Sequence, residues 1–272
     1  MKLYVLDHGK LSIDKGLLDG SRQLDTFYDP NAPVEMVEYP VYTVLIDHPE
    51  GKVLFDTACH PDSMKGHWPD YLKKSFPYHA VESQHLLNRL EQLNLRTEDI
   101  DYVIISHLHF DHAGSLEMFP NSKIIVHEDE LSNTMENYLQ NTEVPGYVRE
   151  EIKAWEDADL QWKTVPKTAD KVTLMEGIDI LNYGPGHSYG MLGLHIQLPS
   201  TGSIVLASDA IYSKMNYVPP IQLPSSVFDP EGYKRTIEQV KLIEEQYQAQ
   251  IWFGHDVEQF QSLIKSTEGF YE

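Results

Sequence analysis

Short apolar runs rich in Val, Ile and aromatic side chains recur along the chain and predict β-strands. They cover residues 3–6, 42–46, 53–55, 102–106, 124–127, 178–182, 192–198, 204–207 and 251–254. Two longer segments, residues 81–95 and 233–247, instead carry apolar residues at the i, i+3, i+4 and i+7 spacing of an amphipathic helix. Strands mixed with helices, without a strict alternation of the two, predict an α/β fold in which two packed sheets have helices outside them.

Two segments between these elements are predicted to be loops. Residues 14–40 and 57–79 lack a regular apolar pattern, and the second segment contains several prolines and aromatic residues. Long loops inside a compact domain usually have a function. Because no repeat, low-complexity tract or Ser/Gly linker interrupts the chain, we predict a single domain over residues 1–272.

Composition narrows the range of partners. The 272 residues include 42 Asp and Glu against 21 Lys and Arg, a formal net charge of -21. This excess disfavours nucleic acid and anionic membranes, whose phosphates attract basic surfaces. The single cysteine, Cys59, suits a reducing compartment. No apolar run has the form of a signal peptide or reaches the roughly 18 residues of a membrane span. We therefore expect a cytoplasmic protein that acts on a neutral small molecule.

The clearest chemical signal directly follows the fourth predicted strand. Residues 107–112 read HLHFDH, the pattern HxHxDH. His107 and His109, two positions apart at a strand end, can point to one side and share a metal ion. The adjacent Asp111 and His112 can reach a second ion. Imidazole and carboxylate ligands suit zinc, with cobalt, iron and manganese as alternatives.

Three further residues stand in the same context as this motif. His187, Asp209 and His255 each lie just past the end of an apolar run. Rigid scaffolds present functional groups on loops at strand ends. A lone histidine at a strand end is more often structural, but three such residues together with HxHxDH favour metal ligands. We predict a site for two divalent metal ions per chain.

Four segments resemble the successive metal motifs of the metallo-β-lactamase superfamily. They are SHLHFDHAG at residues 106–114, GPGHS at 184–188, SDAIY at 208–212 and FGHD at 253–256. Within the superfamily the chain most resembles the N-acyl homoserine lactonases, through Phe110, through Tyr212 after Asp209, and through Glu258-Gln259 after FGHD. The resemblance implies an αββα sandwich of two mixed sheets with the metals at one edge.

The same resemblance implies an activity and a set of ligands. It implies an enzyme that opens the lactone ring of N-acyl homoserine lactones to give N-acyl homoserines, so that its partner is a small acyl lactone; a homodimer is compatible with it. One zinc ion is implied on His107, His109 and His187. The other is implied on Asp111, His112 and His255, with Asp209 bridging the two.

Roles are also implied for residues beside the ligands. Tyr212 is implied to face the substrate carbonyl, and Asp111 to return a proton to the leaving alkoxide. Asp56, which closes the strand 53–55, resembles the carboxylate that holds a ligand imidazole in the right tautomer. The alternatives are a packed aromatic ring for Tyr212 and a solvated turn residue for Asp56.

The substrate pocket is the least specific prediction. Phe110 is expected to line its floor. Five other residues would form an apolar channel for an acyl chain or, equally well, ordinary core: Leu11, Ile13, Leu17, Phe76 and Tyr78. The histidines outside the motifs are predicted to be structural or exposed, and Cys59 to be a packed thiol; these histidines are His8, His48, His60, His67, His79, His85, His127 and His195.

Other functions share parts of this pattern. A glyoxalase II-like thioester hydrolase has a similar HxHxDH, but the glutathione carboxylates call for basic residues, and the segment 258–272 offers only Lys265. A β-lactamase is disfavoured because no ligand cysteine occurs in the segments 184–188 and 208–212. Ribonuclease Z is disfavoured because the chain is strongly acidic. An oxygen-reducing di-iron protein is disfavoured because the chain has no flavin domain. A metal-bound sensor or binding module without catalysis is the alternative from a different class.

Overall fold

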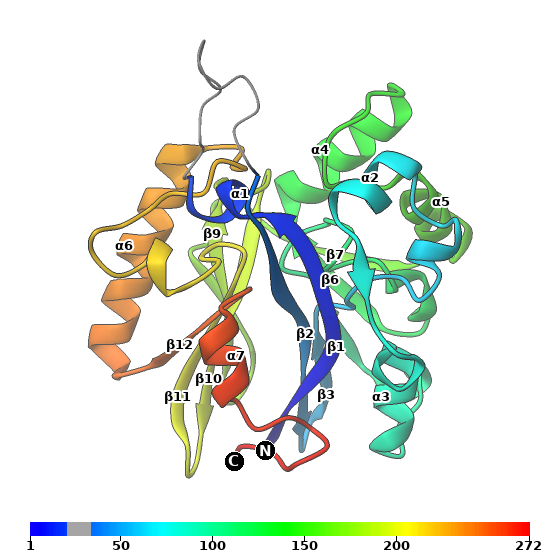
Figure 1. Ribbon diagram of the computed structural model, residues 1–272. Coiled ribbons are helices and arrows are strands. Elements are labelled where there is room, and N and C mark those ends of the chain that lie inside the picture. The colour runs from blue at the N-terminus through cyan, green and yellow to red at the C-terminus, as the bar shows by residue number, and fades with distance from the viewer. Residues whose placement is uncertain (21–33) are drawn as a thin grey trace.

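Two β-sheets pack face to face in the computed structural model, which describes residues 1–20 and 34–272 (Figure 1). The seven-stranded sheet has the order β4-β1-β2-β3-β5-β6-β7 and consists of β1 (Lys2–Asp14), β2 (Met36–His48), β3 (Gly51–Phe55), β4 (Tyr78–His79), β5 (Tyr102–Ile104), β6 (Lys123–His127) and β7 (Gln161–Val165). The five-stranded sheet has the order β12-β11-β10-β9-β8 and consists of β8 (Lys171–Met175), β9 (Ile178–Gly184), β10 (Met191–Leu198), β11 (Gly202–Ser208) and β12 (Gln250–Phe253).

Both sheets are mixed. In the first, β1 to β4 pair antiparallel while β3, β5, β6 and β7 pair parallel. In the second, only the β11–β12 pair is parallel among the described strands. Parallel neighbours end at the same edge of a sheet, so the loops after β3, β5, β11 and β12 can meet.

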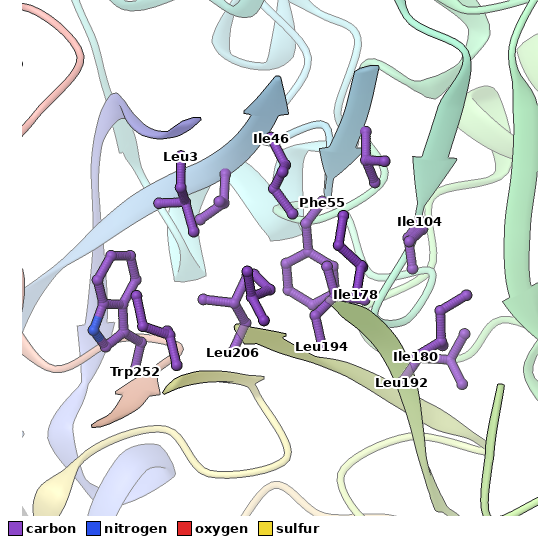
Figure 2. Close-up of a cluster of buried hydrophobic side chains, with 14 of the residues drawn as sticks. Leu3, Ile46, Phe55, Ile104, Ile178, Ile180, Leu192, Leu194, Leu206 and Trp252 are labelled. Carbon is purple, nitrogen blue, oxygen red and sulfur yellow. The ribbon is translucent and has the colours of Figure 1, made fainter. Parts of the chain in front are cut away.

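The main core lies between the sheets. Successive side chains of a strand point to opposite faces, so Val53 and Phe55 join this core while Leu54 faces the other way. Figure 2 shows the apolar side chains of both sheets meeting, with labels on Leu3, Ile46, Phe55, Ile104, Ile178, Ile180, Leu192, Leu194, Leu206 and Trp252. Burying each such side chain stabilises the fold by roughly 1.5–3 kcal/mol.

Helices cover the outer faces of the sandwich (Figure 1). Apolar residues of α3 (Leu86–Gln92), α4 (Glu128–Leu139) and α5 (Arg149–Asp157) pack on the seven-stranded sheet. Those of α6 (Pro230–Tyr247) pack on the five-stranded sheet. The remaining helices are the short α1 (Lys15–Asp19), α2 (Asp70–Ser75) and α7 (Val257–Ser262). The predicted αββα sandwich is confirmed. None of the helices in the described ranges is long and apolar enough to cross a membrane.

Several boundaries differ from the predicted ones. The strands β4, β7 and β8 were not predicted, and all three lie at sheet edges, where exposed faces dilute the apolar signal. The predicted helix 81–95 is a 3₁₀ turn at Glu82–Gln84 followed by α3, which ends early because Asn94 adopts φ 58°. The predicted loop 57–79 contains α2 and β4, and the predicted loop 14–40 contains α1 and the start of β2. Residues 21–33 of the predicted loop 14–40 lie outside the described residues.

Candidate metal centre

Strand ends from both sheets converge on one site. Ser106 and the HxHxDH motif follow β5, and Ser106 accepts a hydrogen bond from Leu192 N of β10 (2.9 Å), which links the two sheets. Asp209 directly follows β11, whose last residue pairs with Phe253 of β12, so Asp209 and His255 leave neighbouring parallel strands at the same edge. His187 follows β9 in the turn 184–188.

The first group of ligand-type atoms consists of three imidazoles. His187 Nε2 lies 3.1 Å from His107 Nε2 and 2.9 Å from His109 Nδ1. All three rings are edge-on to one another. Asp209 Oδ2 lies 3.4 Å from His187 Nε2 and 3.9 Å from His107 Nε2. Four ligand-type atoms therefore surround one point.

The second group combines carboxylates with imidazoles. Asp111 Oδ2 lies 3.7 Å from His112 Nε2 and 3.6 Å from His255 Nε2. Asp209 Oδ1 lies 3.3 Å from His112 Nε2 and 2.9 Å from His255 Nε2. The two oxygens of Asp209 thus face different groups, so that this carboxylate lies between them.

The hydrogen bonds behind these side chains show that a cation fits. His112 Nδ1 donates to Asp56 Oδ2 (2.9 Å) and His255 Nδ1 donates to the carbonyl of Pro40 (2.9 Å). Each ring then turns its Nε2 toward Asp209, yet among the described residues these two nitrogens and Asp209 Oδ1 are buried without a well-oriented hydrogen-bond partner. Unpartnered buried polar atoms are costly. A divalent ion on such nitrogen and oxygen donors removes the cost.

Charge differs between the two groups. Burial and neighbouring imidazoles lower the pKa of His107 and His109 well below the usual range, and burial lowers that of His187. These rings are neutral at pH 7 and offer lone pairs. Burial opposes protonation of His112 and His255, but Asp209 and Asp111 outweigh it and raise both pKa values. The carboxylates therefore draw positive charge to this side, as a proton or as a metal ion.

Asp56 holds His112 from behind, as expected. It follows β3 with φ 65°, a left-handed conformation uncommon for aspartate. Its Oδ1 accepts from Ser106 N (2.7 Å) and its Oδ2 from the Ser106 hydroxyl (2.9 Å), besides the bond with His112. At 3% exposure it is not a solvated turn residue. It fixes the tautomer of His112 and ties the β3 and β5 loops together.

Tyr212 contacts the first group. Its hydroxyl lies 2.8 Å from His187 Nδ1, a nitrogen that also faces the carbonyl of Ser226 at 3.2 Å. When His187 turns the lone pair of Nε2 to a metal, Nδ1 carries the proton, so Tyr212 accepts there and keeps its own O–H proton for another partner. Burial raises the pKa of Tyr212 well above its usual range, so the phenol stays protonated.

A cavity of about 540 Å³ opens beside Tyr212. Tyr212, His255 and Tyr39 line it, and the Tyr39 hydroxyl donates to Asp111 Oδ2 at 3.4 Å. Its apolar lining consists of Leu18, Val37, Met215, Val218, Pro220 and Val257. Its volume is typical of small-molecule sites. Sequence reasoning missed Tyr39, which lies near the start of the long strand β2, within the predicted loop 14–40, and belongs to no motif.

The residues proposed for an acyl channel lie elsewhere in the described chain. Leu11, Ile13, Tyr78 and Phe110 are buried in one hydrophobic cluster with Trp68 and Cys59, and Leu17 and Phe76 pack against it. None of the six lines the cavity beside Tyr212. The alternative of ordinary core describes their contacts. Phe110 lies within the HxHxDH motif, whereas Leu11 and Ile13 lie on β1 and Tyr78 on β4, far from the motif in sequence.

The remaining histidines and the cysteine lie outside the candidate ligand groups. Among the described residues, the groups able to hold a metal ion contain none of the eight histidines outside the motifs. His60 and His67 instead stack on each other, with ring centroids 3.7 Å apart. Cys59 is a buried free thiol.

Comparisons with known proteins agree with the fold. A sequence profile of the metallo-beta-lactamase superfamily matches residues 36–243. The whole chain is 37% identical over 273 residues to N-acyl homoserine lactonase AiiB of Agrobacterium fabrum, covering 99% of it. It is 28% identical to an N-acyl homoserine lactonase of Bacillus thuringiensis, over 96% of this chain and 95% of the relative.

A solved structure gives the same similarity in three dimensions. It is an N-acyl homoserine lactone hydrolase with the product N-hexanoyl-L-homoserine bound at its catalytic metal centre. The TM-score is 0.82 at 28% identity, with 100% of this chain and 98% of that chain covered. The architecture of this chain is therefore similar to that of a hydrolase crystallised with its product.

Proposed function

Because the chain belongs to the metallo-beta-lactamase superfamily and, within it, to the N-acyl homoserine lactonases, we propose that it hydrolyses the lactone ring of N-acyl homoserine lactones. The products are N-acyl homoserines, and the reaction removes a quorum-sensing signal. One observation carries this proposal. Two groups of ligand-type atoms share Asp209, and Tyr212, whose hydroxyl contacts His187, also lines a largely apolar cavity.

We propose that the two groups hold two zinc ions, with cobalt, iron or manganese as chemically similar substitutes. His107, His109 and His187 would hold one ion and Asp111, His112 and His255 the other, with Asp209 shared. Two such ions supply a hydroxide nucleophile near neutral pH and polarise the carbonyl that it attacks.

The side chains of the protein do the rest. The O–H of Tyr212, left free by the bond at His187 Nδ1, donates to the lactone carbonyl oxygen as negative charge develops there. Asp111 Oδ2, which faces both the ligand nitrogens and the Tyr39 hydroxyl, takes up the proton released on attack and returns it to the alkoxide that leaves the opened ring.

The cavity beside Tyr212 suits the acyl chain. His255 and Tyr212 line it, and its other lining residues include aliphatic side chains together with charged groups such as Lys15 and Glu258. A neutral lactone head with an apolar tail matches this arrangement and the strongly acidic chain better than an anionic glutathione thioester does. We propose that the tail lies along Leu18, Val37 and Val257.

A substrate panel tests the proposal. The purified enzyme should hydrolyse N-acyl homoserine lactones faster than glutathione thioesters, β-lactams or simple aryl esters. A pH indicator follows the proton released on ring opening, and mass spectrometry should show the gain of one water. If the glutathione thioester is turned over tenfold faster than every lactone, the chain is a thioester hydrolase. If nothing is hydrolysed although metal is bound, it is a sensor or binding module.

A pair of neighbouring leucines tests where the tail binds. Both leucines pack against the cluster of Phe110 and Trp68, but of the two only Leu18 lines the cavity. Leu18→Ala should lower kcat/KM for long-chain lactones relative to short ones by a few-fold, up to about tenfold, because each buried CH₂ is worth at most about 0.8 kcal/mol. The matched control Leu17→Ala should leave that ratio unchanged. The opposite result would place the tail against the hydrophobic cluster.

A further inference from the structure

One buried carboxylate outside the metal centre has no part in the proposed chemistry. Glu130, in the first turn of α4, is 0% exposed. Its Oε1 accepts from Leu108 N (2.8 Å) and from the Tyr147 hydroxyl (2.9 Å), and its Oε2 accepts from Gly190 N (3.1 Å). The hydrogen bonds found for this carboxylate thus come from neutral donors.

These donors belong to the segments that carry the first group of metal ligands. Leu108 stands between His107 and His109, while Gly190 follows His187. The third segment is the loop around residue 147. The Tyr147 ring packs edge-on against His109, with centroids 4.7 Å apart, and Gly146 approaches so closely that a Cβ there would lie 2.6 Å from His109 Cδ2.

We infer that Glu130 is a positioning residue for the ion held by His107, His109 and His187, an inference that rests on the proposed metal-dependent function. Hydrogen bonds to an ionised carboxylate are stronger than neutral ones, and burial strengthens them further. Glu130 accepts hydrogen bonds from both Leu108 N and Gly190 N, and it thereby fixes the distance between two loops. These loops carry His107 and His187, which are 80 residues apart in the sequence.

The second group of ligands has separate supports. His112 is held by Asp56, and His255 by the carbonyl of Pro40. Loss of the Glu130 contacts should therefore weaken one metal ion and spare the other. General loosening of the fold would instead affect both ions.

The substitution Glu130→Gln tests this with little change in size. A glutamine amide places an NH₂ donor where one oxygen accepted, so a backbone N–H of Leu108 or Gly190 then faces another donor. Glu151→Gln is the matched control. Glu151 of α5 is also 0% exposed and accepts a hydrogen bond from Trp68 Nε1 (2.9 Å), but it has no hydrogen bond to the ligand segments.

The measurement is metal retention by the full-length protein. Each variant is loaded with cobalt, challenged with graded EDTA, and assayed for cobalt per chain and for the visible absorption of the bound ion. Wild type and Glu151→Gln should lose two equivalents at similar EDTA concentrations. Glu130→Gln should lose one equivalent about 10- to 100-fold more readily. Adding Asp111→Asn, which removes a ligand of the other group, should weaken the remaining equivalent as well.

Two results would overturn this inference and leave the proposed function intact. One is that Glu130→Gln retains cobalt as well as wild type does. The other is that Glu151→Gln loses cobalt as readily as Glu130→Gln does. A wild type that never holds two equivalents would instead overturn the proposed dinuclear function, and this inference with it. If Glu130→Gln does not fold, Tyr147→Phe removes one donor while keeping the ring against His109. It should weaken one equivalent by a few-fold, and unchanged retention would contradict the role of Glu130.

Discussion

At the scale of single residues, the backbone carbonyl of Ser226 determines whether the Tyr212 hydroxyl is free to donate a hydrogen bond. Because Ser226 O faces His187 Nδ1, that nitrogen keeps its proton in a metal-bound site, and the phenol of Tyr212 is left with a free donor. A tyrosine that donated its proton to the histidine would have none for a substrate. The sequence places Tyr212 three residues after Asp209. The tautomer of His187, however, depends on Ser226, which lies 39 residues after His187 in the chain.

Tyr212→Phe should keep both metal ions and lose roughly one to two orders of magnitude in kcat. This loss is smaller than the two to three orders typical of a dedicated oxyanion donor, because the metal shares the task. Metal analysis and lactone turnover are measured on the same sample. Tyr189→Phe is a control, since that hydroxyl bonds to Asn137 (3.0 Å). Loss of metal in Tyr212→Phe would show a structural role, and unchanged turnover would show no role.

At the scale of elements, the start of α6 is joined to the turn that carries His187. The Asp229 side chain caps the helix by accepting from Glu231 N (3.1 Å), and its backbone N–H donates to Gly186 O (2.8 Å). Gly232 packs so closely on the turn that a Cβ would lie 1.9 Å from Pro185 O. The helix therefore supports a metal ligand as well as covering the sheet.

Asp229→Ala should lower Tm by roughly 2–4 °C, because an N-cap is lost from a chain of this size. Lactone turnover below the transition should change little, since the backbone bond to Gly186 does not need the side chain. Calorimetry and initial rates measure the two effects. Asp229→Asn keeps a capping oxygen and should restore most of the Tm. If activity falls in proportion to Tm in both variants, the cap also positions His187.

At the scale of the whole molecule, a buried histidine far from the metal centre couples stability to pH. His8 of β1 is 0% exposed, donates from Nδ1 to Gln84 O (2.8 Å) and bonds through Nε2 to the Thr43 hydroxyl (2.9 Å). Burial lowers its pKa from 6.5 to about 4, with the nearby Asp7 and Arg89 acting in opposite directions. The folded protein thus keeps His8 neutral where the unfolded chain protonates it.

The stability linked to His8 should be complete above pH 6.5 and decrease as the pH falls toward 4, because the unfolded state binds the extra proton in that window. The loss is up to about 1.4 kcal/mol per pH unit. Urea unfolding at pH 7, 6 and 5 measures it, and His8→Asn should show a shallower dependence over the same range. An equal slope in both proteins would assign the acid sensitivity to other groups, such as the metal ligands.

The fold could be predicted where the local pattern is strong. The central strands, such as β10, read as continuous runs of buried residues, whereas the edge strands β7 and β8 are half-exposed and escaped notice. The helix α4 was also missed, because its acidic, polar sequence has few apolar residues. The single domain over residues 1–272, the homodimer and the cytoplasmic location stay predictions.

The sequence by itself determined the chemistry of the metal centre. HxHxDH is a local motif, and His187, Asp209 and His255 stand at strand ends that both sheets bring to one edge. Residue type and local spacing are properties of the sequence, so they can be recognised without a structure. The candidate ligands and the class of metal could therefore be proposed from the sequence.

Only the tertiary structure decided which side chains reach across the site. In the folded chain the two oxygens of Asp209 face different groups. Glu130 accepts hydrogen bonds from three loops, and Tyr39 lines the cavity. The tertiary structure also directed Leu11 and Phe110 into a core cluster instead of the cavity. Such contacts join residues far apart in the chain, and their geometry depends on sheet packing and loop conformation, which a one-dimensional pattern does not encode.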